Sequence, residues 1–155
     1  MTQESLLRLV ALFPLGGITM NLNETCAAWA PRVLSILRIM AALLLLQHGL
    51  SKFFGFPVPW PAGGGAPAMF SLYWFAGVIE IVGSVLLALG LFTRPVAFIL
   101  AGHLAFVYFI GHAPRGFYPA LNGGSLAIMY CFVCFYLAFA GGGPWSADAM
   151  IRGKK

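Results

Sequence analysis

The stretch VLSILRIMAALLLLQHGLSKFFGF, residues 33–56, is apolar enough to enter a lipid bilayer, yet it carries Arg38, Gln47, His48 and Lys52. A transmembrane helix needs about 20 predominantly apolar residues to cross about 30 Å of hydrocarbon. An ionisable side chain at the centre of such a helix costs about 2.5–3.5 kcal/mol and usually faces a bundle interior, where it finds a partner. The stretch therefore predicts a membrane span whose polar face turns towards other spans.

The composition of the whole chain favours lipid as its solvent. Of the 155 residues, 61% are hydrophobic and 8% are charged, whereas about a quarter of the residues in a soluble domain are charged. The net charge of +5 does not indicate a nucleic-acid partner, because the Lys and Arg residues are scattered singly and form no basic stripe. A single domain is expected at this length.

Three further apolar segments complete the predicted fold. They cover residues 70–92, 95–110 and 124–140, and two Pro- and Gly-rich loops at 55–69 and 111–124 interrupt the apolar sequence. Only helices and closed barrels can cross a bilayer, and none of the apolar segments shows the strict alternation of a barrel strand. We therefore expect an all-α fold, an integral-membrane four-helix bundle.

Basic residues predict how this bundle is oriented, since cytoplasmic loops carry an excess of Lys and Arg. One side of the membrane would hold six basic residues and the other side two. The six are Arg8, Arg32, Arg94, Arg152, Lys154 and Lys155, and the two are Lys52 and Arg115. Both termini are therefore expected on the cytoplasmic side.

The chain divides into three predicted parts. Residues 1–30 form an N-terminal extension, residues 31–145 the four-helix transmembrane domain, and residues 146–155 a short basic amphipathic tail. Within the extension, residues 6–18 are too short to span the membrane. They would form an interfacial helix, or translation starts at Met20 and they are not structural.

The tail has the features of a short surface helix. Ser146 is a suitable N-cap residue, and Asp148 is placed favourably in the first turn. The basic end of the tail suits an anionic cytoplasmic leaflet.

A polar cluster inside the membrane is predicted around Glu80, the only acidic residue in the four spans. With a rise of about 1.5 Å per residue, Glu80 lies near the middle of the membrane. Arg38 and His103 lie towards the cytoplasmic side of it, and His48 and Lys52 towards the outer side. We expect Glu80 to pair with Arg38 or His103, and His48 and Lys52 to line the outer mouth.

Two main interpretations of this cluster stay open. A buried ion pair with additional hydrogen bonds would fix the register of the helices, as polar residues in membrane proteins often do. Alternatively, His, Arg and Glu beside aromatic walls could supply hydrogen-bond donors and a proton path for a quinone headgroup. A pathway for a transported substrate is a third option.

Cys131 and Cys134 form a C-x-x-C pattern within the last apolar segment. Redox motifs of this kind work at an exposed helix start that follows a strand. Apolar surroundings blunt the reactivity of a thiol, so core packing is favoured over a redox or metal-binding role. No metal site is predicted, and the sequence has no recognisable flavin, nucleotide or iron–sulfur motif.

Several motifs, in this order and spacing, resemble the DoxX family of small bacterial membrane proteins. These are H-G-x-x-K at the end of the first span, E-x-x-G-x-x-L-x-x-G-L-x-T-R on the second, G-F…N-G-G before the fourth, and a glycine run before W-S-x-D. The resemblance covers about residues 33–150. The polar positions that match are Arg38, His48, Gly49, Lys52, Glu80, Arg94, His112 and Asn122.

The resemblance implies a four-helix bundle in the bacterial inner membrane and a link to quinone-associated oxidoreductase systems, one of which is a thiosulfate:quinone oxidoreductase. Asn122 joins the candidate site on this ground. One departure is that the family often has Gly-Glu-Leu at the start of the fourth span, where this chain has Gly124, Ser125 and Leu126. The missing carboxylate leaves Glu80 alone and argues against a self-contained enzyme.

The predicted function is therefore an accessory or quinone-interacting subunit of a bacterial membrane oxidoreductase system. A quinone is the candidate ligand, and the electron source would be another membrane or peripheral redox protein. A homo-oligomer stays open. The alternatives are a non-catalytic assembly or scaffold protein, whose polar cluster only stabilises the fold, and a small-molecule transporter.

Overall fold

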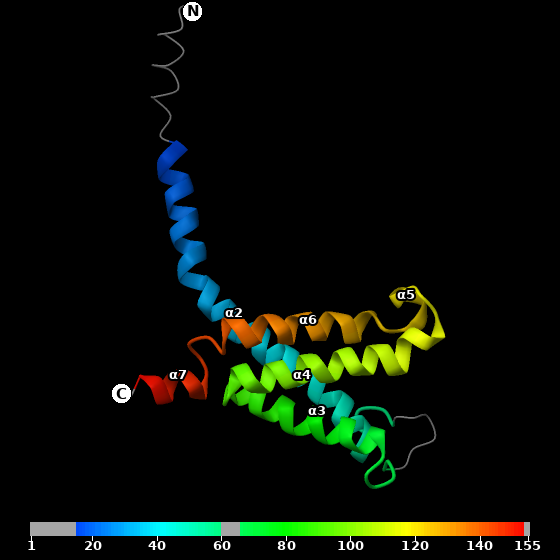
Figure 1. Ribbon diagram of the computed structural model, residues 1–155. Coiled ribbons are helices and arrows are strands. Elements are labelled where there is room, and N and C mark those ends of the chain that lie inside the picture. Colours follow the sequence, from blue (N-terminus) through cyan, green and yellow to red (C-terminus); the bar gives the residue numbers. More distant parts are fainter. Residues whose placement is uncertain (1–14, 60–65, 154–155) are drawn as a thin grey trace, which may run out of the picture.

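The computed structural model describes residues 15–59 and 66–153, with side chains from residue 22 onward. All the regular structure in this part of the chain is helical (Figure 1). The main helices are α2 (Leu15–Phe54), α3 (Leu72–Leu89), α4 (Thr93–Val107) and α6 (Ser125–Ala140). Shorter elements are the π-helical turn η1 (Tyr108–His112), the 3-10 turn η2 (Ala113–Arg115), α5 (Pro119–Asn122) and α7 (Ala147–Arg152).

The four main helices form the predicted all-α membrane bundle. Helix α2 packs against α3, α3 against α4, α4 against α6, and α6 against α2, which closes the bundle. Three stretches are long and apolar enough to cross a membrane, namely Leu22–Phe54, Leu72–Leu89 and Thr93–Arg115. The fourth, α6, is apolar but has only 16 residues. The prediction of a four-helix membrane bundle is thus confirmed.

The side chains of the bundle follow the pattern of a protein dissolved in lipid. Its buried core is small and made of aliphatic residues, including Leu45, Leu87, Leu100 and Leu137. Large apolar side chains such as Phe98 lie exposed on the outside. Bilayer contact accounts for these exposed side chains, because lipid tails solvate them as well as a protein core does.

Helix α2 begins well before residues 33–56, the stretch from which the sequence predicts the first span. Its 40 residues extend about 60 Å, about twice the thickness of the hydrocarbon core. The N-terminal part leads away from the bundle (Figure 1), and the helix continues through Pro31 without a break. The division at residue 30 stays a prediction, and most of the proposed interfacial segment 6–18 lies outside the described residues.

Two glycines let α2 and α3 approach closely. A Cβ atom on Gly49 would lie 3.1 Å from the Gly77 carbonyl oxygen and 3.0 Å from the Ile81 backbone nitrogen. A Cβ atom on Gly77 would lie 2.5 Å from the ring of Phe53. Small residues serve this purpose in membrane helix pairs generally. The close approach brings the last turns of α2 beside the middle of α3.

Specific caps end α3 and begin α4. Gly90 adopts a left-handed conformation (φ 68°), and its N–H and that of Leu91 donate to carbonyls in the last turn of α3. At the start of α4, the N–H groups of Phe92 and Thr93 donate to the carboxylate of Asp148, at 2.9 and 2.8 Å. The turn between the two helices is therefore attached to α7.

Candidate functional site

Glu80 lies in the middle of α3 and is paired on both of its carboxylate oxygens. Lys52 Nζ, from α2, lies 2.6 Å from Oε2, and His103 Nε2, from α4, lies 3.3 Å from Oε1. Because a carboxylate accepts hydrogen bonds, Nε2 of His103 carries the hydrogen in this contact. The side chains of Glu80, His103 and Lys52 are only 5%, 7% and 12% exposed. The predicted pairing with His103 is therefore seen, and Lys52 is the second partner.

Arg38 does not pair with Glu80, so of the two partners expected for Glu80 only His103 is found. The guanidinium is fully buried near the opposite end of the bundle. It donates to the carbonyl oxygens of Gly142 (2.9 Å), Trp145 (2.7 Å), Ala88 (2.5 Å) and Leu87. Arg38 therefore satisfies backbone groups at the end of α3 and in the glycine run before α7. It is not part of the group formed by Glu80, Lys52 and His103, called the Glu80 group below.

A chamber of about 310 Å³ lies beside the Glu80–Lys52 pair, and all four main helices contribute to its wall. Ligand pockets usually have volumes of about 300–1,000 Å³ and combine apolar walls with a few polar groups. The apolar part of the wall includes Leu45, Ala76, Leu104, Val107, Leu126 and Ala127. The polar part consists of His48, Ser51, Lys52, Tyr73, Glu80, His112, Arg115 and Tyr130. This space, called the chamber below, is large enough for a small ring with substituents.

His48 lines the chamber, as do Lys52 and Glu80. Its ring packs edge-on against Tyr130, with a distance of 6.3 Å between the ring centroids. Tyr130, on α6, is 8% exposed and also lines the chamber. The chamber thus places an imidazole and a phenol, both hydrogen-bonding groups, beside apolar surface.

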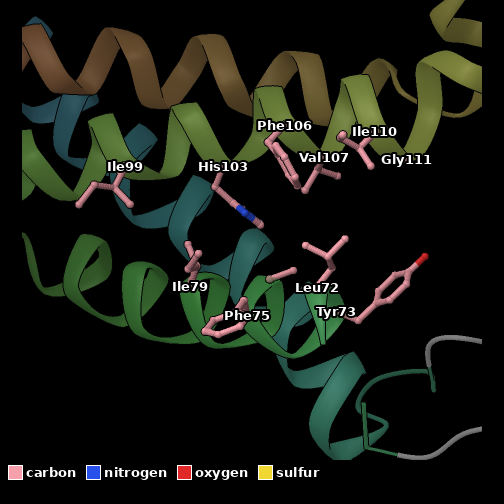
Figure 2. Close-up of a pocket in the computed structure, with 11 residues that line it drawn as sticks. Leu72, Tyr73, Phe75, Ile79, Ile99, His103, Phe106, Val107, Ile110 and Gly111 are labelled. Carbon is pink, nitrogen blue, oxygen red and sulfur yellow. The ribbon is translucent and has the colours of Figure 1, made fainter. Parts of the chain in front are cut away.

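An apolar groove lies on the other side of His103. It is about 390 Å³ in volume and runs between α3 and α4 into η1. Figure 2 shows the His103 ring extending from α4 into the space between these helices, with Phe75, Ile79 and Phe106 around it. The groove opens on the outer surface of the spanning helices, where the bilayer would lie. His103 and the hydroxyl of Tyr73 are therefore the polar side-chain groups in an otherwise apolar, lipid-facing wall.

Asn122 lies at the loop end of the chamber and organises the loop before α6. Its side-chain amide donates to the Gly116 carbonyl at 2.8 Å, and its Oδ1 accepts from the Gly124 N–H at 2.8 Å. Its backbone carbonyl lies 3.1 Å from Nδ1 of His112. Asn122 does not itself line the chamber, whereas His112 does. The structure thus brings five of the six predicted residues to this half of the bundle, and Arg38 is the exception.

The sequence analysis missed several residues of the chamber. The sequence did not indicate Tyr130 or Tyr73 as site residues, and it indicated Arg115 only as a charge that orients the chain. A signal for Tyr130 was present, since it is the one phenol on the same helical face as Ala127 and Cys134. The loop positions of Arg115 and His112 had no such signal, because the wide turn η1 cannot be read from helical periodicity.

Asp148 forms a second polar site at the other end of the bundle, outside the spans. Partial burial opposes its ionisation, but the hydrogen bonds from Thr93 and Phe92 outweigh this effect and lower its pKa below 3.8. Ser146 caps α7 as predicted, since its Oγ accepts from the Ala149 N–H at 3.2 Å. The predicted tail helix is present over the residues described.

The two cysteines of the C-x-x-C pattern are free, and Cys134 is part of the buried core. This placement agrees with the packing role. In the described residues, no three His, Cys, Asp or Glu side chains are grouped so that they could hold a metal ion.

Comparison with known proteins gives a consistent result. A model of the DoxX family matches residues 33–113. An uncharacterized protein of Haemophilus influenzae is 46% identical over 123 residues, which are 77% of this chain and 91% of that protein. Inner membrane protein YphA of Escherichia coli is 34% identical over 84 residues, which are 53% of this chain and 60% of that protein. No solved structure matches the chain.

Proposed function

Because this chain belongs to the DoxX family and is a multi-pass inner-membrane protein, we propose that it is a quinone-interacting, accessory subunit of a membrane oxidoreductase system. One observation carries the proposal. The Glu80 group lies between a chamber inside the bundle, which Lys52 lines, and a lipid-facing groove, which His103 lines. A lipid-soluble molecule with a polar head needs a partly polar chamber for its head and an apolar groove for its tail.

The chamber suits the head of a quinone for chemical reasons. A quinone ring is flat and apolar on its faces, and its two carbonyl oxygens accept hydrogen bonds. His48 and Tyr130 are positioned to donate such bonds, and Leu45, Ala127 and Leu104 offer apolar contact to the ring. The groove beside Phe75 would hold part of the apolar tail.

The Glu80 group supplies a path for protons. Reduction of a quinone to a quinol takes up electrons and protons in equal number, and oxidation releases both. Lys52, Glu80 and His103 form a continuous chain of hydrogen-bonded titratable groups from the chamber to the groove. Such chains are typical of proton relays in membrane proteins. The electrons would come from another membrane or peripheral redox protein.

The orientation that we propose places the loop end of the chamber outside the cytoplasm. In the described part of the chain, Arg32, Arg94 and Arg152 lie at the end of the bundle opposite to Lys52 and Arg115. This bias favours both termini in the cytoplasm. A reporter fused after Lys155 tests it, because green fluorescent protein would fluoresce there and alkaline phosphatase would be inactive. The reverse pattern would invert the orientation.

Filling the chamber tests the main proposal. Ala127 is buried in the chamber wall, so Ala127→Leu would occupy part of the volume without removing a polar group. We expect the quinone content of the purified variant to be about tenfold lower than that of the wild type. The content is measured by chromatography after solvent extraction. Gly102→Leu is the matched control, because a Cβ atom at Gly102 meets nothing within 4 Å. Equal quinone content in all three proteins would contradict the proposal.

A structural role is the second candidate, and it too has an observation in its favour. Both carboxylate oxygens of Glu80 are already paired with protein groups. Glu80→Gln separates the two roles, with Glu24→Gln, on the exposed part of α2, as control. A variant that accumulates normally but loses quinone supports the quinone proposal. Loss of the folded variant, together with a wild type that contains no quinone, would support the structural role.

A further inference from the structure

The chamber has an imbalance of charge that quinone binding does not explain. Between residues 25 and 147 the sequence contains a single acidic residue, Glu80. The chamber wall nevertheless contains two cations, Lys52 and Arg115, and two histidines, His48 and His112. Lys52 is paired with Glu80, which His103 also contacts. Arg115, which is exposed at the loop end, has no carboxylate partner among the described residues.

The loop end of the chamber, formed by His112, Arg115 and Gly123 and called the mouth below, is held by hydrogen bonds. Nδ1 of His112 lies 3.1 Å from the Asn122 carbonyl oxygen. A carbonyl oxygen only accepts, so Nδ1 carries the hydrogen; Nε2 then accepts, for example from a P–OH group, while the ring is neutral, and donates to an anionic oxygen when the ring is protonated. Asn122, only 4% exposed, is itself fixed by two hydrogen bonds of its side chain. The imidazole thus stands on a supported part of the loop.

The turn η1 contributes to this geometry. Residues Tyr108–His112 form a π-helical turn directly after α4, and such turns occur often at functional sites. The wider turn carries Gly111 and His112 to the wall of the chamber, and η2 then brings Arg115 to the same wall. The site therefore depends on a local departure from α-helical geometry.

We propose that the mouth is an oxyanion-binding site, in which Arg115 and His112 hold a phosphate-type group. The planar guanidinium offers paired donors that match two oxygens of such a group. A cation at the edge of the hydrocarbon region gains more from a counter-ion than one in water. The phosphate-type group belongs either to an anionic lipid headgroup or to a small soluble anion that enters from the aqueous side. The proposal is independent of quinone binding.

Purified full-length protein in a nonionic maltoside detergent allows a test with no quinone present. Inorganic phosphate is titrated against chloride at constant ionic strength, and the thermal transition is followed. A site that binds only the folded state makes the transition rise and then saturate. We expect this behaviour for the wild type, and we expect Arg115→Gln to weaken the apparent affinity by about 10- to 100-fold, as for loss of a charge-assisted hydrogen bond. His112→Gln should weaken it less.

The control is Arg32→Gln, which makes the same change on an exposed residue of α2 at the opposite end. It should bind phosphate as the wild type does. Phosphatidylglycerol and zwitterionic phosphatidylcholine, added to the same micelles, distinguish the two sources. A response to phosphatidylglycerol alone, lost in Arg115→Gln, assigns the site to a lipid headgroup, and a response to free phosphate assigns it to a soluble anion. The proposal would be overturned if wild type and Arg115→Gln responded equally to free phosphate and equally to phosphatidylglycerol.

Discussion

Lys52 and Glu80 form an ion pair of 2.6 Å between α2 and α3, and they lie in a part of the bundle that is largely closed to solvent. Two features align them. The close approach at Gly49 and Gly77 sets the two helices side by side. Side chains in a helix lean towards its N-terminus, so Lys52 reaches back along α2, where its Nζ also lies 3.2 Å from the His48 carbonyl oxygen.

This pair predicts a strong coupling between two substitutions. Lys52→Met leaves the Glu80 carboxylate with His103 alone, and loss of one partner of a buried pair costs about 3–5 kcal/mol. Replacing both charges, as in Lys52→Met with Glu80→Gln, should restore much of the stability, because no uncompensated charge then remains. The measurement is thermal unfolding of each purified variant in detergent. Simple additivity of the two single effects would show that the pair is not coupled.

The contact between α2 and α3 makes a second prediction. Gly49→Ala would place a methyl group against the backbone of α3, at 3.0 and 3.1 Å from backbone atoms of Ile81 and Gly77. The helices must then separate, which would also lengthen the Lys52–Glu80 contact. We expect a clear drop in the melting temperature, measured by loss of soluble monodisperse protein after heating.

The matched control for this prediction is Gly102→Ala in α4. A Cβ atom there meets nothing within 4 Å, and alanine favours a helix over glycine by about 1 kcal/mol. The control should therefore be neutral or slightly stabilising. If Gly49→Ala behaved in the same way, close packing at this point would not be needed.

Arg38 makes a third prediction, in which charge alone is not sufficient. Lysine carries the same charge but has no planar fork with five donors, so Arg38→Lys cannot reach all four carbonyl groups. Each buried carbonyl left without a donor costs about 1–3 kcal/mol. We expect Arg38→Lys to fall well below wild-type levels in membranes, measured by immunoblot, whereas Arg32→Lys should accumulate normally. Wild-type accumulation of Arg38→Lys would show that its bonding pattern is not required.

Asp148 predicts a dependence of stability on pH. Its pKa is lowered in the folded protein from 3.8, so the folded state favours the ionised carboxylate. The contribution is present in full above about pH 4 and is lost as the pH falls through the lowered value. Asp148→Asn keeps one acceptor oxygen but replaces the other with an NH2 group that cannot accept, so the stability near neutral pH should fall by about 1 kcal/mol, as for loss of one hydrogen bond. The difference between wild type and Asp148→Asn should then shrink on acidification.

Comparing thermal unfolding of both proteins over the acidic range checks this prediction. The comparison cancels the titration of groups that the two proteins share, such as Glu80. Glu24→Gln, an exposed change elsewhere, should keep the full dependence on pH. A constant difference between wild type and Asp148→Asn at all pH values would mean that the carboxylate does not act through its charge.

The sequence was sufficient to predict the bundle and its central acid, because apolar length and the scarcity of acids are properties of the chain itself. It could not choose between the candidate cations. Arg38 and Lys52 are 14 positions apart on one helix face, about 21 Å along the axis. Which of them meets Glu80 depends on how far α2 slides along α3, and this offset is set by packing at Gly49.

The role of Arg38 was hidden for a different reason. Its partners are backbone carbonyls, which every residue has, so no residue type identifies them in a sequence. They converge only because the glycine run folds tightly. A Cβ atom on Gly142 would lie 2.8 Å from side-chain atoms of Thr93 and Ser146, and Gly143 has a positive φ of 72°. The sequence showed the glycine run as a motif, but it did not show that this run surrounds the Arg38 guanidinium.

The acceptors of the Arg38 hydrogen bonds are synthesised at different times. Two of its acceptors belong to α3, but Gly142 and Trp145 are synthesised more than 100 residues after it. While the ribosome makes the intervening chain, the guanidinium is in a newly inserted helix with its final coordination incomplete. A product that ends before the glycine run would keep this defect permanently. The coordination of Arg38 is therefore completed only after the glycine run has been made and has folded against the first span.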